Sequence, residues 1–174
     1  MKEIIIESPV KSNISSKLEP GNKVKIRGTL YTMRDATLAN IEIDIKKKKS
    51  QFNIYKNSII YFCGPSPAPK KKKIGSCGPT TTQRMEKYIP LLSKMGIKAI
   101  IGKGKVSNSF LELLKKYNIV YLLAVGGAGA YLTTFIKESS IIAYKQLGPE
   151  AIYQLEVEDF PCIVAANKGK QIFS

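Results

Sequence analysis

Residues 99–125, AIIGKGKVSNSFLELLKKYNIVYLLAV, contain a strand–helix–strand unit that decides the fold class. Ala99–Ile101 is a short apolar run that ends in a glycine turn, as buried strands do. Ser107–Tyr117 carries apolar residues at helical spacing, and Ile119–Val125 is apolar throughout. Strands that alternate with helices run parallel and are covered by those helices, so this stretch predicts an α/β fold.

The same alternation continues on both sides of this unit. From Thr80, apolar residues recur at helical spacing as far as Met95, and Gly96 is a natural helix C-cap. Pro90 interrupts this helix or restarts it as a new first turn. Downstream we expect a helix at Ala128–Lys137 and strands at Ile141–Tyr144 and Cys162–Ala166.

The first sixty residues are predicted to be rich in β-structure. Strands are expected at Val24–Tyr31, at Ile41–Ile45, which alternates strictly, and at Ile59–Cys63. Residues 64–79 contain four prolines and three glycines, which indicates a loop that we expect to be mobile between Pro67 and Ile74. The sequence therefore predicts a single α/β domain over residues 1–174, with a short extension at 1–19.

Composition excludes several classes of protein. The chain has 174 residues, of which 44% are hydrophobic, enough for a real core. No stretch approaches the roughly 20 apolar residues that a membrane span needs, and no signal-peptide pattern opens the chain. Cys63, Cys77 and Cys162 lie far apart, as in a reduced protein, so we expect a cytoplasmic location and no membrane association.

The formal net charge of +15 raises the question of nucleic-acid binding. Lys46–Lys49 and Lys70–Lys73 supply 8 of the 28 basic residues, and each run adjoins a loop, where solvated lysines are common. The sequence has no aromatic-rich RNA-binding strand, GXXG clamp or zinc knuckle. We therefore expect no nucleic-acid partner, and attraction of small dianions or of an acidic subunit is at least as well supported.

Residues 75–88, GSCGPTTTQRMEKY, suggest an anion site. Pro79 presets the backbone, and Thr80 or Thr81 can cap the helix expected to begin there. Thr80 and Arg84 are four residues apart and would share a helix face. A hydroxyl, free amides and a guanidinium would then converge on a carboxylate or phosphate.

Two glycine turns and one strand end are further candidates. Gly102-Lys103-Gly104 follows a strand at the edge where α/β proteins bind ligands, although it is not a Walker P-loop, and solvated lysines explain it equally well. Gly126–Gly129 lacks dinucleotide-binding spacing and favours close helix–strand packing. Arg34 ends an alternating strand, where an ion pair with Asp35 is the default expectation.

The chain contains no histidine, so a Ser/His or Cys/His nucleophile is excluded. The cysteines lack C-x-x-C spacing, which argues against zinc or an iron–sulfur cluster bound by this chain alone. An isolated enzyme would need Thr80, a lysine or a carboxylate such as Glu150 as its base.

Six motifs occur in an order that resembles the β subunit, or C-terminal part, of class I iron–sulfur-dependent fumarate hydratases and the related L-tartrate dehydratases. The resemblance covers roughly residues 20–170. The motifs are TLYTMRD (29–35), GPSP (64–67), GPTT with Arg84-Met85 (78–85), GKGK (102–105), Gly126-Gly127 and LEVEDFP (155–161).

The resemblance implies a swivelling β/β/α domain that works with a separate α subunit, in an expected α2β2 assembly, with a homodimer as the alternative in isolation. It places the [4Fe–4S] cluster on the α subunit and gives this chain no metal or cofactor ligand. The implied activity is reversible hydration of fumarate to (S)-malate in the tricarboxylic acid cycle. The implied substrate-binding residues are Arg34, Thr80, Arg84 and Lys103, with Thr80 and Arg84 catalytic.

One position departs from the family pattern, because Leu38 stands where a histidine is usual. Substrate preference near Arg34 is accordingly open among fumarate, tartrate and a methylated fumarate such as mesaconate. A hypothesis of another class remains: a basic RNA- or phosphate-binding module that uses the two lysine runs.

Overall fold

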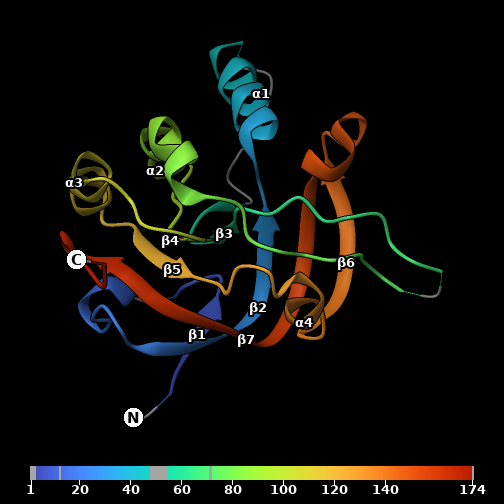
Figure 1. The fold of residues 1–174 in the computed structure, drawn as a ribbon. Helices are drawn as coiled ribbons and strands as arrows, with labels where there is room; N and C mark the ends of the chain where they lie inside the picture. The colour runs from blue at the N-terminus through green and yellow to red at the C-terminus, as the bar shows by residue number, and fades with distance from the viewer. Residues whose placement is uncertain (1–2, 12, 48–54, 71, 174) are drawn as a thin grey trace.

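The computed structural model of this chain describes residues 3–11, 13–47, 55–70 and 72–173. Its strands form one mixed sheet in the order β1-β2-β3-β4-β5-β7-β6, with β8 paired to β7 (Figure 1). The strands are β1 (Ile4–Ser8), β2 (Lys23–Thr32), β3 (Ile59–Tyr61), β4 (Ala99–Gly102), β5 (Val120–Leu123), β6 (Ile136–Ala143), β7 (Ile152–Asn167) and β8 (Lys170–Gln171).

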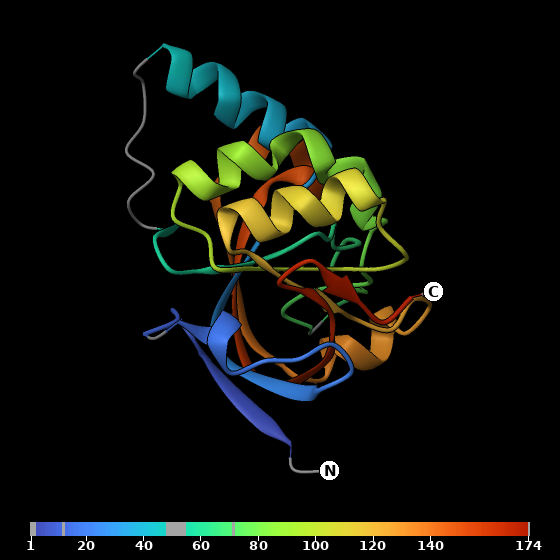
Figure 2. The same ribbon diagram turned by 90° about the vertical axis from the view of Figure 1, so that its left-hand side faces the viewer.

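Helices cover both faces of this curved sheet. Three of them lie on one face, and α4 lies on the other side (Figures 1 and 2). The α-helices are α1 (Asp35–Lys46), α2 (Ile89–Lys94), α3 (Asn108–Tyr117) and α4 (Gly129–Thr133), and the 3₁₀ helices are η1 (Ile14–Ser16), η3 (Thr82–Tyr88) and η4 (Lys145–Glu150).

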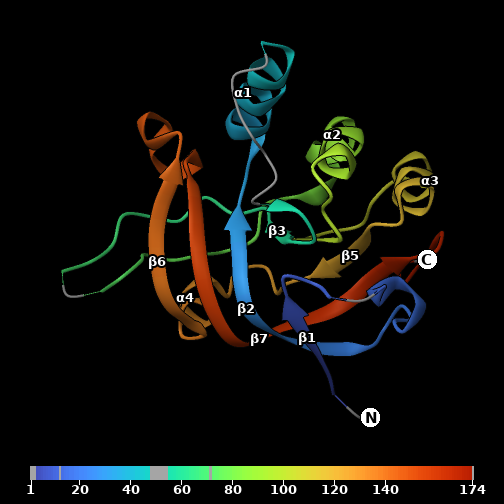
Figure 3. The same cartoon turned by 180° about the vertical axis from the view of Figure 1, so that it is seen from behind.

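The expected parallel pairing is confirmed for β4 and β5, and the parallel block extends further to β3, β2 and β1. The last long strands differ, because β7 runs antiparallel to β2, β5 and β6. β7 is 16 residues long and curves across the sheet, so one strand reaches all three neighbours (Figure 3). The prediction of Cys162–Ala166 covered only its end.

Alternation along the strands builds two hydrophobic clusters. In β3 and the residue after it, Ile59 and Tyr61 face the cluster beneath α4, and Ile60 and Phe62 face the cluster beneath α1, α2 and α3. All four side chains have no exposed surface. Both faces of a parallel strand are thus buried, which is why this short strand reads as a continuous apolar run.

The predicted strand at Ile41–Ile45 is wrong, because this segment belongs to α1. The buried positions of α1 are Thr37, Leu38 and Ile41, which follow helical spacing, while Ile43 is 47% exposed. The alternating isoleucines therefore imitate a strand, and packing of one helical face against the sheet decides the conformation.

Two predicted helices have different bounds in the structure. The helix expected from Thr80 begins at Thr82 as η3 and restarts as α2, with Pro90 in its first turn. The helix expected at Ala128–Lys137 ends at Thr133, and β6 begins at Ile136. The predicted C-cap is confirmed, since Gly96 follows α2 with φ of 79°.

Among the described residues, no helix combines the length and the apolar character that crossing a membrane requires. Part of the segment 1–19 joins the sheet, because β1 pairs with β2. Lys48, Lys49 and Lys71 of the two lysine runs lie outside the described residues.

Candidate functional site

The carboxyl ends of four parallel strands form the edge at which the predicted site residues meet. β2, β3, β4 and β5 are adjacent and parallel, so their carboxyl ends lie along one edge of the sheet. Arg34 follows β2, Gly64 follows β3, Lys103 follows β4 and Gly126 follows β5. Ligands of α/β sheets bind at this kind of edge.

Thr80 reaches the same edge as part of an extended segment inserted between β3 and β4. Its amide donates to the carbonyl oxygen of Phe62 at 2.7 Å, and its carbonyl accepts from the amide of Lys103 at 3.1 Å. The amide of Thr82 returns to the carbonyl of Lys103 at 3.0 Å. These main-chain hydrogen bonds place Thr80 directly beside Lys103.

The helix-terminus anion site predicted at residues 75–88 is wrong in its details. η3 begins after Thr80, so Thr80 and Arg84 do not share a face of this helix. Thr81 occupies the N-cap position without a side-chain hydrogen bond to the helix. The amides of Thr80 and Thr82 already donate to carbonyls, so they are not free to bind an anion.

Arg34 is held at the start of α1 by a carboxylate from a distant segment. Its Nη2 lies 3.5 Å from Oε1 of Glu150, and both side chains are about one quarter exposed. Oε2 of the same carboxylate accepts from the Ala36 amide at 2.8 Å. Within the described part of the chain, the buried Nε of Arg34 has no hydrogen-bond partner.

Gly64 makes room for the guanidinium of Arg34. A Cβ atom at this position would lie 2.8 Å from Nη1 of Arg34 and 3.0 Å from its Cδ. It would also lie 3.1 Å from the carbonyl oxygen of Pro149, so a larger residue has little room on either side. The glycine after β3 therefore determines how closely Arg34 approaches this edge.

Arg84 forms an ion pair with Asp35, the residue that follows Arg34 in the chain. Its Nη2 contacts Oδ2 of Asp35 at 2.6 Å, and its side chain is 50% exposed. The expected ion pair between Arg34 and Asp35 does not form, because Asp35 pairs with Arg84 and Arg34 pairs with Glu150. Each arginine is thus oriented by a carboxylate that is distant in sequence. These pairs were not predicted from the sequence, although Asp35 belongs to the TLYTMRD motif at residues 29–35.

Lys103 is the third cation at this edge. Its side chain is partly buried, and its Cδ would lie 3.5 Å from a Cβ at Gly126. Arg34 pairs with Glu150 and Arg84 pairs with Asp35, so Lys103 gives these five residues a net positive charge. Such a surplus favours a small anion.

Leu38 does not belong to the exposed part of this edge. Its side chain has no accessible surface and packs in the cluster beneath α1, α2 and α3. Leu38 is therefore a core residue of this chain.

The cysteines do not form a metal site with one another in the described residues. Sγ of Cys63 and Sγ of Cys77 are 3.4 Å apart and both thiols are buried. Burial raises the pKa of Cys63 and of Cys162. No group of three or more Cys, Asp or Glu side chains suited to a metal occurs in these residues.

The glycine turn at Gly126–Gly129 packs against the loop at residues 76–78. This differs from the packing between a helix and a strand that the sequence favours at this turn. A Cβ at Gly129 would lie 2.9 Å from the amide nitrogen of Gly78. The amide of Cys77 donates to the carbonyl of Gly129 at 3.2 Å. This contact fixes the end of the loop that leads to Thr80; the mobility of residues 67–74 stays a prediction.

Comparison with known proteins agrees with the sequence resemblance. The model of the family "Fumarase C-terminus" matches residues 1–174. Fumarate hydratase 2 of Leishmania major is 36% identical over 91% of this chain and 28% of its own length. The anaerobic class I fumarate hydratase of Escherichia coli K12 is 35% identical over 99% of this chain and 31% of its own length.

The chain thus spans less than a third of these fumarate hydratases. A putative L(+)-tartrate dehydratase subunit beta of Methanocaldococcus jannaschii is 38% identical over 90% of this chain and 84% of its own length. A family match over all 174 residues, together with a relative of similar length, is decisive. This chain belongs to the Fumarase C-terminus family.

Proposed function

We propose that this chain is the β subunit of a two-subunit class I fumarate hydratase and that it supplies the cationic half of a dicarboxylate site. The observation that carries the proposal is the convergence of Arg34, Thr80, Arg84 and Lys103 at one sheet edge from separate segments. Main-chain hydrogen bonds and carboxylate partners hold these residues in place. Such preorganisation is what electrostatic catalysis requires.

The three cations suit the charge changes of hydration and dehydration. Fumarate and malate carry two carboxylates, and removing the weakly acidic proton beside one of them builds negative charge in the transition state. Arg34 and Arg84 can each hold a carboxylate with two parallel N–H donors, while Lys103 provides a point charge. Cations fixed before the reaction stabilise this charge without reorganisation.

Thr80 is proposed to act at the proton that moves. The main-chain hydrogen bond between Thr80 and Lys103 supports this role, because it brings the Thr80 backbone next to a cation of the site. A hydroxyl is a weak base, so this role depends on neighbouring groups that the partner subunit supplies.

An iron–sulfur cluster would supply the Lewis acid for the departing hydroxide. The described residues of this chain contain no group of three or more Cys, Asp or Glu side chains that could hold a cluster. We therefore assign the cluster to a separate α subunit in an α2β2 assembly located in the cytoplasm. The isolated chain is then expected to lack hydratase activity.

Reconstitution tests this proposal. The purified chain should show no fumarate hydration, and addition of the cluster-bearing subunit under anaerobic conditions should produce oxygen-sensitive activity. Arg84→Ala should lower kcat/KM by about a hundredfold or more, as expected for a lost charge contact in a dry site. Lys87→Ala is the matched control, because Lys87 is exposed on the same η3 helix. Full activity of the isolated chain, or near-normal turnover by Arg84→Ala, would contradict the proposal.

L-tartrate is the second candidate substrate. The relative named as a tartrate dehydratase subunit beta matches this chain over 84% of its own length. Competition between fumarate, L-tartrate and mesaconate for the reconstituted pair distinguishes the candidates by their ratios of kcat/KM.

A further inference from the structure

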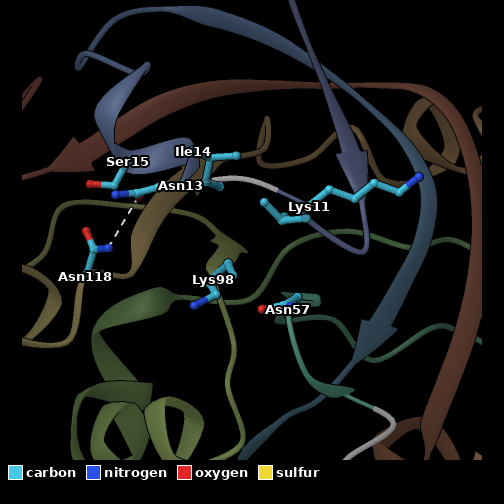
Figure 4. Close-up of a pocket in the computed structure, with 8 residues that line it drawn as sticks. Lys11, Asn13, Ile14, Ser15, Asn57, Lys98 and Asn118 are labelled. Carbon is cyan, nitrogen blue, oxygen red and sulfur yellow. Dashed lines mark hydrogen bonds between the residues drawn. The ribbon is translucent and has the colours of Figure 1, made fainter.

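A polar cavity lies at the edge of the sheet opposite to the proposed site. It encloses about 360 Å³, a volume typical of pockets that bind small molecules. Figure 4 shows it between the start of the chain and the turns that precede β3, β4 and β5. Its lining residues are Val10, Lys11, Asn13, Ile14, Ser15, Asn57, Lys98 and Asn118.

The chemistry of this lining favours an anion. Three asparagine amides and two lysine ammonium groups offer N–H donors, and no acidic residue occurs among the described residues that line the cavity. Lys98 and Asn57 lie on one side of the cavity, and Asn13 and Asn118 lie on another (Figure 4). The side chain of Lys11 extends away from the others, so Lys98 is the cation nearest to the amides (Figure 4).

The walls of the cavity are preformed by main-chain hydrogen bonds. The carbonyl of Asn57 accepts from the Val10 amide at 2.7 Å, and the Asn57 amide donates to Gly96 at 2.9 Å. The amide of Lys98 donates to Ser58 at 3.0 Å, and its carbonyl accepts from Val120 at 3.1 Å. Little ordering is then required when a ligand binds.

A buried polar cluster fixes the remaining wall. Nδ2 of Asn167 donates to the carbonyls of Ser15 and Leu18 at 2.8 and 2.7 Å. Its Oδ1 accepts from the Ser15 hydroxyl at 2.8 Å. Asn118 Nδ2 closes the rim through a 3.4 Å contact with Oδ1 of Asn13.

We propose that this cavity binds a small oxyanion, a phosphate- or carboxylate-bearing metabolite, with Lys98 as its charge partner and Asn57 and Asn118 as amide donors. Lys98 precedes β4 and Lys103 follows it. The two positions are five residue steps apart along an extended strand, so about 17 Å separates their Cα atoms. The cavity is therefore distinct from the proposed dicarboxylate site, and neither proposal depends on the other.

NMR titration of the ¹⁵N-labelled full chain tests this site. Inorganic phosphate and succinate are the two probes, added at constant ionic strength with chloride as the balancing anion. We expect saturable shifts of the side-chain amide signals of Asn57 and Asn118 with at least one probe. Phosphate alone would identify a phosphate site, and both probes would identify a general oxyanion site.

Matched variants locate the binding. Lys98→Ala should weaken it about tenfold or more, the effect of losing one charged hydrogen bond. Lys94→Ala removes an exposed charge nearby, and Lys103→Ala removes the cation at the opposite edge; both should leave these shifts unchanged. Asn118→Gly removes one amide without backbone strain, because Asn118 has φ of 53°, and it should also weaken binding.

Three results would overturn the proposal. They are the absence of saturable shifts with either probe, equal binding by Lys98→Ala and the unaltered chain, and loss of the shifts in Lys103→Ala. Thermal unfolding of each variant confirms that the fold is retained before binding is compared.

Discussion

Gly64→Ala provides the sharpest test of how Arg34 is positioned. An ordinary contact requires about 3.4 Å, whereas the new Cβ would lie 2.8 Å from Nη1 of Arg34. The guanidinium then has to move by about 0.6 Å, since the new Cβ is also crowded by the main-chain carbonyl oxygen of Pro149 at 3.1 Å. A misplacement of about 1 Å can cost about a hundredfold in rate, so we expect kcat/KM to fall by about tenfold, or about 1.4 kcal/mol.

The assay is the initial rate of fumarate hydration by the reconstituted pair, with thermal unfolding measured in parallel. Gly78→Ala is the matched control, because its Cβ would meet Gly129 Cα at an ordinary 3.6 Å. Neither glycine has a positive φ, so alanine is compatible with both backbones. We expect the control to keep nearly full activity.

A double-mutant cycle tests whether Gly64→Ala lowers activity by displacing Arg34. In an Arg34→Ala background, Gly64→Ala should cost almost nothing more, because no guanidinium remains to be displaced. The reasoning is refuted if Gly64→Ala has normal activity, or if it lowers activity equally with and without Arg34.

Three other changes test separate parts of the structure. Gly102→Ala would bring a Cβ into overlap with Oγ1 of Thr82, so urea denaturation should show a loss of about 1–3 kcal/mol of stability. Burial raises the pKa of Tyr121 to about 12. The unfolded chain therefore loses this proton first, and stability should fall from about pH 10 to pH 12 by roughly 2 kcal/mol more in the native sequence than in Tyr121→Phe. Replacing the lysines of 46–49 and 70–73 by glutamine should leave turnover of the reconstituted pair almost unchanged; a collapse of turnover, or salt-sensitive RNA binding by the unaltered chain, would favour the nucleic-acid hypothesis.

The spacing of apolar residues predicted secondary structure correctly where it fitted only one kind of element. Val24–Tyr31 alternates and lies within β2, and the apolar residues of Ser107–Tyr117 form the buried side of α3. Ser107 caps α3, because its side chain accepts from the Phe110 amide. The pattern failed at Ile41–Ile45, because the alternation is typical of a strand, yet the segment belongs to α1, which buries Ile41 and leaves Ile43 exposed.

The ion-pair partners of the site depended on contacts between distant segments. Sequence adjacency favours a pair between Arg34 and Asp35, yet η4 brings Glu150 to Arg34 and η3 brings Arg84 to Asp35. These exchanges join residues that are 116 and 49 positions apart. The pattern of neighbouring residues in the sequence cannot predict ion pairs between segments so far apart.

The amino-acid sequence by itself determined the α/β class, the family and the residues at this sheet edge, because strand–helix alternation and short glycine motifs are local properties of a chain. Only the tertiary structure decided that Thr80 lies beside Lys103, that each arginine has a remote carboxylate, and that a polar cavity occupies the opposite edge. The reason is geometric: parallel pairing of β2 to β5 collects separate loops at each end of the sheet, and the contacts between those loops exist only after folding.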